Sequence, residues 1–141
     1  MMSQHRYLGI DYGTKRIGIA ISDPLNIIAR TLTTVVNTKN SLNEIKSFVD
    51  EYSISTIVVG MPLNLKGEKG MKALEVEEFV RQMKQNMDCT IIFWDERFTS
   101  KRVHQTYREL NVKKKQRQAK TKVDEMAAAF ILQSYLDSRK Q

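Results

Sequence analysis

The stretch that decides the fold reads YLGIDYGTKRIGIAIS over residues 7–22. Residues 7–11 and 17–22 have the composition of short β-strands, and the second segment alternates isoleucine with small residues. The turn between them contains Gly13, which can adopt the positive φ that tight turns require. These residues predict a β-hairpin, and the Thr- and Val-rich residues 30–37 predict a third strand that extends it.

Helical and strand patterns alternate through the remainder of the chain. Apolar runs at 56–60 and 90–94 predict the buried strands of a parallel sheet. A Ser-x-x-Glu capping pattern beginning at Ser41 predicts a helix over 41–52. Further helices are predicted over 71–86, from 99 or 100 to about 110, and over 122–138. This order predicts one α/β domain over residues 1–141, with a five-stranded mixed sheet, an antiparallel meander followed by parallel strands, flanked by helices.

Two of the predicted helices have apolar faces that should pack on the sheet. The inner face of the 71–86 helix is predicted to consist of Leu74, Phe79, Val80 and Met83. The inner face of the last helix is predicted to contain Asp124, Ala128, Ile131 and Tyr135. Three consecutive alanines, at 127–129, would let that helix approach the sheet closely and bring its first acidic residue toward the strand ends.

The composition limits the class of protein. The chain has 141 residues, 41% of them hydrophobic and 28% charged, which suits one ordinary core. The longest apolar stretch, residues 126–132, is far shorter than the roughly 20 residues of a membrane span. The first residues lack a secretory leader pattern, so we expect a cytoplasmic location without membrane contact. A single cysteine, Cys89, excludes an internal disulfide and fits a reducing compartment.

The positive charge is concentrated in one segment. The whole chain has a formal net charge of +7, whereas residues 97–122 alone hold 10 basic and 1 acidic residue, a net +9. Such a concentration is typical of a surface that binds a phosphate backbone, although a solvated basic loop without a partner would have the same composition. The predicted nucleic-acid contacts in this segment are Lys113, Lys114, Lys115, Arg117, Lys120 and Lys122.

Acidic residues stand at the ends of predicted elements. Asp11 ends the first strand, Asp95 and Glu96 end the last strand, and Asp124 opens the last helix. In an open α/β sheet such strand ends border the ligand crevice. Each acid also has a structural alternative, because aspartate stabilises turns and helix N-termini, and either acid of the 95–96 pair could form a salt bridge. Side chains alternate between faces, so only one of Asp95 and Glu96 can point toward a given face.

Converging carboxylates predict a site for hard divalent cations. Mg²⁺ and Mn²⁺ prefer oxygen ligands, and two such ions would activate a water and stabilise the leaving oxygen of a phosphodiester. Together with the basic segment at 97–122, the acids predict a metal-dependent nuclease.

Four blocks of the sequence resemble the YqgF family, whose members are also called RuvX-like. The blocks occur in order along nearly the whole chain: GIDYGTKRIGIA at 9–20, GMP at 60–62, DERFTS at 95–100 and DEMAA at 124–128. The resemblance implies a ribonuclease H-like fold, a cytoplasmic location and trimming of the 5′ end of the 16S rRNA precursor. Cleavage of Holliday junctions in recombination or repair is the alternative activity assigned to the family.

The resemblance also implies roles for individual residues. By the family motifs, Asp11, Asp124 and the pair Asp95 and Glu96 bind metal and catalyse, and the predicted phosphate contacts are Lys15, Arg16 and Arg97. Apart from the resemblance, Tyr12 is the predicted stacking partner for a base, because it lies in the hairpin turn beside Asp11. Phe93 and Trp94 are expected in the core instead.

Three functions remain open at this point. A pre-rRNA nuclease would act on structured RNA, within ribosomal precursor particles, and could work as a monomer. A junction resolvase would have to form a homodimer, because it needs two active sites to cut two strands. A third possibility is a non-catalytic module that binds RNA or the ribosome through the basic segment.

Overall fold

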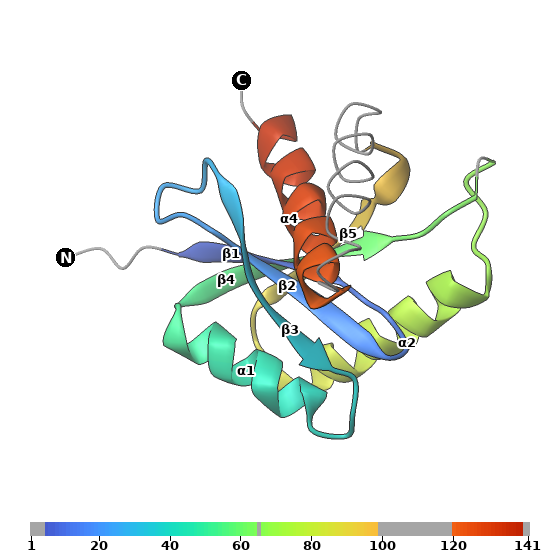
Figure 1. Ribbon diagram of the computed structural model, residues 1–141, viewed down its shortest axis with the longest axis horizontal. Helices are drawn as coiled ribbons and strands as arrows, with labels where there is room; N and C mark the ends of the chain where they lie inside the picture. Colours follow the sequence, from blue (N-terminus) through green and yellow to red (C-terminus); the bar gives the residue numbers. More distant parts are fainter. Residues whose placement is uncertain (1–4, 65, 99–119, 140–141) are drawn as a thin grey trace.

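A five-stranded mixed sheet forms the middle layer of the protein, for which a computed structural model describes residues 5–64, 66–98 and 120–139. The strands lie in the order β3-β2-β1-β4-β5 (Figure 1). Their bounds are β1 Arg6–Asp11, β2 Arg16–Ser22, β3 Ala29–Val36, β4 Ile54–Met61 and β5 Thr90–Asp95. Strands β1, β2 and β3 pair antiparallel, whereas β4 pairs parallel with both β1 and β5. The predicted meander followed by parallel strands is confirmed.

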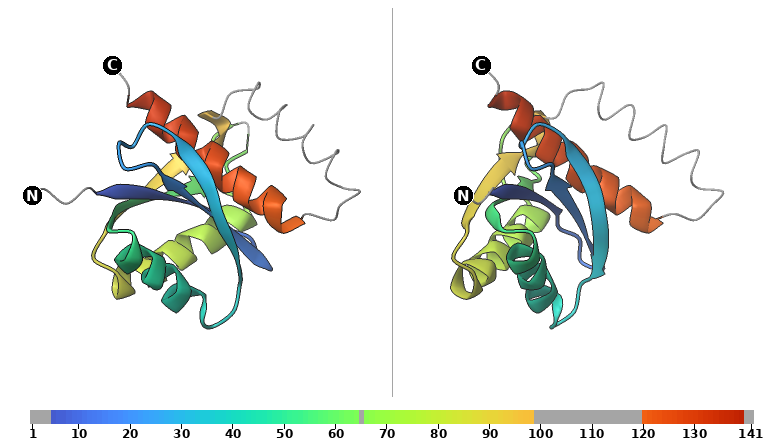
Figure 2. Two further views of the ribbon diagram at one scale, coloured as in Figure 1. Left: turned by 60° about the vertical axis from the view of Figure 1, so that its left-hand side comes forward. Right: turned by 90° about the vertical axis from the view of Figure 1, so that its left-hand side faces the viewer.

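Helices cover both faces of this sheet. Their bounds are α1 Ser41–Glu51, α2 Met71–Asn86, the short 3-10 helix η1 Glu96–Phe98, and α4 Lys120–Ser138. Figure 2 shows α1 and α2 below the sheet and α4 across its other face. The helix predicted from 99 or 100 to about 110 lies outside the described residues. Of the helices in the described ranges, none combines the length and the apolar character that crossing a bilayer requires.

The face of the sheet toward α1 and α2 is filled by large aliphatic side chains. The strands contribute fully buried residues that include Leu8, Ile10, Ile17, Ile19 and Ile57. Each such side chain stabilises the fold by roughly 1.5–3 kcal/mol relative to an exposed one. From α2, the buried residues are Ala73, Val76, Phe79, Val80 and Met83.

The predicted inner face of α2 is therefore correct at three positions and wrong at Leu74. Leu74 is 55% exposed, and Ala73 and Val76 take its place. The spacing of 73, 76, 80 and 83 follows one helical stripe, from which position 74 is rotated away.

The face toward α4 has small residues where the helix approaches most closely, beside larger ones such as Val58 and Trp94. A Cβ atom added at Gly9 of β1 would lie 2.7 Å from the Cβ of Leu132 and 2.9 Å from the carbonyl oxygen of Ala128. A Cβ at Gly60 of β4 would lie 2.5 Å from Cδ1 of Ile131. The backbone of α4 thus lies directly against β1, which confirms the close approach predicted from the alanines of this helix.

Two details of the predicted elements are wrong. The capping box at Ser41 does not form, because Asn40 is the N-cap and makes no side-chain cap hydrogen bond. The Ser41 hydroxyl instead accepts the backbone N–H of Thr38 at 2.7 Å and closes the preceding turn. Phe93, expected in the core, is exposed on the edge strand β5, whereas the Trp94 indole is half-buried and donates to Ser134 Oγ at 3.1 Å.

Candidate active site

Asp11 lies at the carboxyl end of β1, on the side of the sheet that α4 covers. Leu8 and Ile10 belong to the cluster under α1 and α2, whereas Gly9 contacts α4. Because side chains alternate along a strand, Asp11 shares the face of Gly9. Its Cα is paired with that of Gly18 in β2, so a glycine stands beside the carboxylate on the neighbouring strand.

Glu96 reaches over the neighbouring strand on that same face. A Cβ at Gly60 would lie 3.2 Å from Cγ and 3.3 Å from Cδ of Glu96, next to its contact with Ile131 of α4. The Glu96 carboxyl group therefore lies over the end of β4, the strand between β1 and β5. This position is available because position 60 has no side chain.

Asp95 is turned away and bound to Arg97. Its Cα pairs with that of Met61, and it follows Trp94, which packs on the α4 side, so alternation places the Asp95 side chain on the other side. The guanidinium Nη2 of Arg97 is 2.6 Å from Asp95 Oδ2, and the Arg97 backbone N–H donates to Oδ1 at 2.9 Å. These hydrogen bonds hold the pKa of Asp95 below its usual value and raise that of Arg97. The two adjacent acids thus have different surroundings.

Arg97 also contacts the connection between β4 and α2. A Cβ at Gly67, whose φ is +82°, would lie 3.3 Å from Nη2 of Arg97. The turn around Gly67 is closed by Asn64, whose Oδ1 accepts the backbone N–H groups of Lys66 and Glu68 at 2.9 Å each. Arg97 is therefore held between a carboxylate and a closed turn, at the same end of the sheet as Glu96.

The start of α4 supplies the third predicted acid. Position 124 lies in the first part of α4, one helical turn before Ala128, which is fully buried against the sheet. The side chain of Asp124 lies outside the part of the chain that the structure describes. Its neighbour Glu125 is only 8% exposed and accepts a hydrogen bond from Thr34 Oγ1 of β3 at 3.4 Å.

Sequence reasoning overlooked Glu125. Its spacing of four residues from Ala129 and seven from Leu132 follows the buried stripe of α4 and could have indicated an acid facing the sheet.

The available donors suit a hard cation. Asp11 and Glu96 offer carboxylate oxygens on one face, and Mg²⁺ and Mn²⁺ prefer such ligands. Among the side chains that the structure describes, no three His, Cys, Asp or Glu residues converge closely enough to hold a metal. Of the four predicted ligand residues, Asp11 and Glu96 lie on one face of the sheet, Asp95 lies on the other, and Asp124 is placed by its backbone alone.

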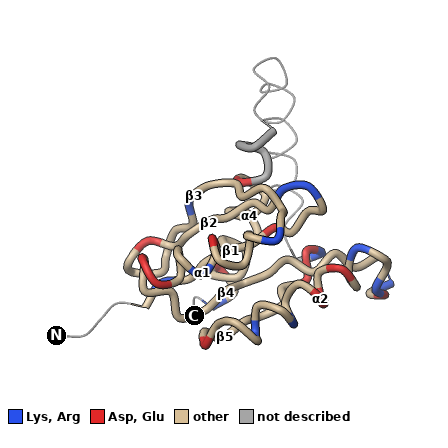
Figure 3. Tube along the Cα trace, turned by 90° about the horizontal axis from the view of Figure 1, so that it is seen from below, with Lys and Arg blue, Asp and Glu red and all other residues tan. Residues whose placement is uncertain are grey.

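The predicted nucleic-acid contacts are only partly described. Lys15 is exposed in the β1–β2 turn and Arg16 is half-buried at the start of β2. Figure 3 shows basic residues at this turn, and interleaved charges of both signs along α2. The side chains that lie outside the described residues are those of Lys113, Lys114, Lys115, Arg117, Lys120 and Lys122.

Tyr12 packs on the face of the sheet opposite to Asp11 and Glu96. Its ring packs on that of Phe79 in α2, with centroids 4.7 Å apart and planes 40° apart, beside the core under α1 and α2. Tyr12, Leu42, Leu74 and Phe79 border a groove of about 460 Å³ on that face. Base stacking by Tyr12 stays a prediction, and one face of the ring is already in contact with Phe79.

The sequence matches a family of nucleases. The protein-family model described as "RuvX: Holliday junction resolvase" matches residues 5–138 of the chain. A protein of Sulfurihydrogenibium sp. (strain YO3AOP1), named "Putative pre-16S rRNA nuclease", is 46% identical over 134 residues, which are 94% of this chain and 90% of that protein. A protein of the same name from Bacteroides fragilis is 43% identical over 136 residues, 96% of this chain and 98% of its own.

Solved structures of resolvases have a similar fold. RuvC of T. thermophilus in complex with a Holliday junction substrate matches with a TM-score of 0.59 and 12% identity, covering 96% of both chains. The fowlpox virus resolvase with Holliday junction DNA matches with a TM-score of 0.56 and 17% identity, covering 96% of this chain and 99% of the other. These matches confirm the expected ribonuclease H-like fold.

Proposed function

Since the chain belongs to the RuvX family, we propose that it is a metal-dependent nuclease that processes the 5′ end of pre-16S rRNA. The names of the curated relatives support the substrate, and their identity extends over almost the whole chain. One observation of the site carries the chemistry: the carboxylates of Asp11 and Glu96 lie on the same face of the sheet, at the carboxyl ends of its parallel strands. Position 124 approaches this face from α4.

Glu96, rather than Asp95, is the proposed metal ligand of the acidic pair. Glu96 lies over Gly60, toward β1, whereas Asp95 binds Arg97. Alternation along β5 places the Asp95 side chain on the other face of the sheet, away from that of Asp11. The proposed ligand set is therefore Asp11, Glu96 and Asp124, with Asp95 as the residue that orients Arg97.

The chemistry follows from this set. Bound Mg²⁺ or Mn²⁺, in the form of two ions, would lower the pKa of an attacking water and stabilise the leaving oxygen of the phosphodiester. The three carboxylates would hold these ions, and the small residues at 9 and 60 would keep α4 close enough to add the third carboxylate.

Basic residues would bind the phosphates on both sides of the cleaved bond. Arg97 is positioned for this by two contacts, the Asp95 carboxylate and the turn at Gly67. Lys15 stands in the turn that follows Asp11, and the basic segment between η1 and α4 supplies further charge. Such contacts act largely independently of nucleotide sequence.

The test compares two labelled substrates, a pre-16S rRNA 5′-leader fragment and a four-way DNA junction, with Mg²⁺, with Mn²⁺ and with EDTA. We expect metal-dependent cleavage of the leader, which the purified variant Asp11→Asn lacks while it still binds the RNA. Cleavage that persists in that variant would reveal a contaminating nuclease or remove Asp11 from the mechanism. Binding without cleavage of either substrate would favour the non-catalytic module.

Resolution of Holliday junctions is the second candidate, because the matching family model carries that description. Symmetric cutting of a junction requires two active sites and hence a dimer, whereas trimming of RNA does not. Sedimentation of the protein with and without junction DNA distinguishes the two. Cleavage confined to the junction by a dimer would replace the rRNA assignment.

A further inference from the structure

The loop between β2 and β3 presents three large aliphatic side chains to solvent. It comprises residues 23–28, with the sequence DPLNII. Leu25 is 70% exposed, Ile28 61% and Ile27 43%, and we call these three residues the apolar tip. A single exposed aliphatic residue is ordinary, but three within four positions form a patch that a soluble surface usually avoids.

The backbone that carries the apolar tip is closed by its own hydrogen bonds. The Asp23 carboxylate accepts the backbone N–H groups of Ile27 at 2.7 Å, Ile28 at 2.8 Å and Leu25 at 3.3 Å. These donors lower the pKa of Asp23, so the carboxylate stays ionised and bonded at neutral pH. Asn26 is held at a φ of 59°, and Pro24 restricts φ at the first turn residue.

Side chains from two other elements attach this loop to the body of the protein. Asn26 donates through Nδ2 to the carbonyl oxygen of His5 at 2.9 Å and accepts the Ser22 hydroxyl at 2.6 Å. Gln133 of α4 donates to the carbonyl oxygen of Ile27 at 3.0 Å and accepts the backbone N–H of Ala29 at 2.8 Å. The apolar tip is thus displayed in one fixed arrangement.

The loop stands at the end of the sheet opposite the acids. It follows Ser22, whose Oγ accepts the backbone N–H of Tyr7 near the start of β1, whereas Asp11 ends that strand. At about 3.3 Å per residue, the two ends of β1 are roughly 17 Å apart. Figure 1 shows the β2–β3 loop and the β1–β2 turn on opposite sides of the molecule. A partner on the tip would leave the catalytic edge accessible.

We propose that the apolar tip inserts into an apolar pocket, bordered by acidic groups, on a protein of the ribonucleoprotein particle that carries the pre-16S rRNA. This inference rests on the proposed function. Because its loop is already held in one conformation, the apolar tip loses little conformational entropy on binding. Side chains that anchor a protein interface share this property. It would hold the nuclease on its substrate particle while the acids act on RNA at the other end.

The side chains of the tip favour a protein pocket over the alternatives. Aliphatic groups neither neutralise phosphates nor stack on bases as aromatic ones do, which argues against naked RNA. Three side chains are also far from the roughly 800 Å² per partner that a stable dimer buries.

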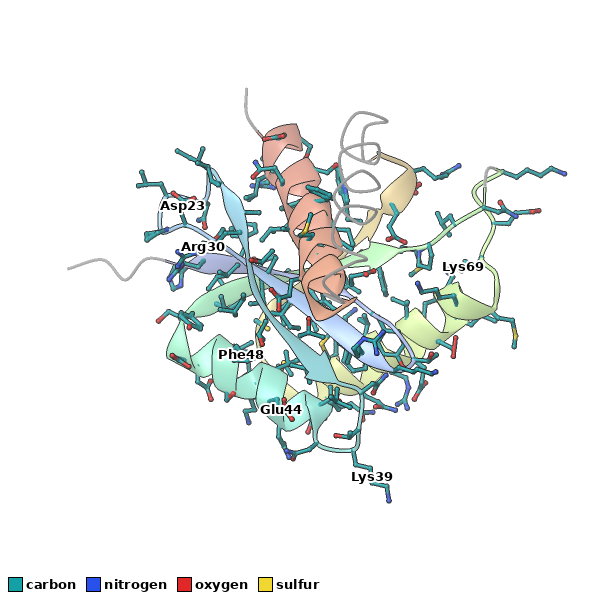
Figure 4. All side chains as sticks on the ribbon, viewed as in Figure 1. Asp23, Arg30, Lys39, Glu44, Phe48 and Lys69 are labelled. Atoms are coloured by element: carbon teal, nitrogen blue, oxygen red, sulfur yellow. The ribbon has the colours of Figure 1, made fainter. Side chains whose placement is uncertain are left out.

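The charged residues around the apolar tip indicate which groups would border the pocket on the partner protein. Arg6 donates through Nε to the carbonyl oxygen of Ser22 at 2.9 Å, directly before the loop. Arg30, labelled beside Asp23 in Figure 4, follows the loop in β3 and is exposed. The Asp23 carboxylate keeps its charge but is turned into the loop by the hydrogen bonds that it accepts, and the Arg6 guanidinium lies over the Tyr52 ring. The exposed Arg30 is therefore the cation that an acidic rim of the pocket would meet.

The experiment compares cleavage of precursor small-subunit particles with cleavage of the same RNA stripped of protein. The test variant carries Leu25→Ser and Ile28→Ser, and the matched control is Val36→Ser, an aliphatic residue of β3 that is 63% exposed outside the tip. We expect the test variant to cleave particles about tenfold more slowly than wild type. On stripped RNA it should stay within about twofold, as should the control variant on both substrates.

Each outcome decides between the partners. Equal cleavage of particles by the test variant and wild type would overturn the proposal. Loss of binding to vesicles containing phosphatidylglycerol, specific to the test variant, would assign the tip to a lipid surface, and a loss of dimer mass would assign it to a second copy. If wild type cleaves neither substrate, the proposed function fails, and co-sedimentation with particles still tests the tip. The single variant Leu25→Ser replaces the double one if the latter does not fold.

Discussion

The two faces of the central sheet are built on opposite principles. Toward α1 and α2, the sheet presents fully buried Leu and Ile side chains that separate the helices from the strands, and we call this side the thick layer. Toward α4, Gly9, Ala20 and Gly60 let the helix backbone meet the strand backbone, and larger residues such as Val58 pack beside them; we call this side the thin layer. The thick layer contains more of the buried hydrophobic residues and should therefore contribute more of the stability. The thin layer fixes the distance between α4 and the strand ends, and so the separation of the proposed ligands.

The largest difference between the faces should appear at the adjacent acids. Glu96→Gln removes the carboxylate on the α4 side and should lower the cleavage rate by about a thousandfold. Losses of this size follow when a group that stabilises charge in the transition state is removed. Asp95→Asn should lower the rate only about tenfold, because Arg97 is misplaced while the metal ligands remain. Single-turnover cleavage of the leader RNA measures both. An equal loss in the two variants would remove the distinction between the faces at this position.

The thick layer should respond to truncation in stability alone. Ile57→Ala removes a fully buried side chain from the α1–α2 side and should lower the free energy of unfolding by about 3 kcal/mol. Well below its melting temperature, the folded variant should cleave at the wild-type rate. Urea unfolding followed by fluorescence, with cleavage assayed in parallel, measures the two effects. A fall in rate comparable to that of Glu96→Gln would show that this face also positions the site.

The thin layer should respond to enlargement in both properties. Gly9→Ala places a Cβ within 2.9 Å of the Ala128 carbonyl oxygen, so α4 has to move outward. We expect a loss of about 2 kcal/mol in stability, the scale of overpacking, together with slower cleavage by the folded variant. The same unfolding and cleavage assays apply. Wild-type cleavage by this variant would indicate that the site tolerates a displaced α4.

The smallest effect should come from the ion pair of Asp95 and Arg97. Its hydrogen bonds lower the pKa of Asp95 in the folded state below the ordinary 3.8, so the pair stabilises the protein above that pH and loses its effect as the pH falls through the lowered value. Since Arg97 is partly exposed, the contribution should be less than about 1 kcal/mol. The difference in urea midpoint between wild type and Asp95→Asn should shrink on acidification. A difference that grows would contradict the direction of the pKa shift.

The sequence predicted the elements well because their signals are local. Alternating isoleucines and the turn at Gly13 specify the hairpin, and β4 and β5 are recognisable as apolar runs. The side on which each acid lies depends on contacts that the local pattern does not contain. Strand β5 ends at Asp95 and η1 begins at Glu96, so alternation stops between the two acids.

Partners distant in the sequence explain the other differences. Tyr12 packs on Phe79, a residue of another helix, and this contact holds the ring on the face of the sheet opposite to Asp11 and Glu96. The Ser41 hydroxyl bonds a turn that precedes its helix instead of capping it. For Ser41 the neighbouring turn determined the role, whereas for Tyr12 the contact with Phe79 sets the ring position and stacking on a base stays a prediction.

The two glycines under α4 differ in how an evolving chain could replace them. The atom nearest a Cβ at Gly60 is Cδ1 of Ile131, which a change to valine would remove, but Cγ and Cδ of Glu96 would still lie 3.2 Å and 3.3 Å away. At Gly9 the nearest atoms are the Leu132 Cβ and the Ala128 carbonyl oxygen, and alanine at either position would retain them. Position 60 can therefore change only if residue 131 becomes smaller and the Glu96 side chain also moves, whereas position 9 can change only if the lineage shifts the whole helix.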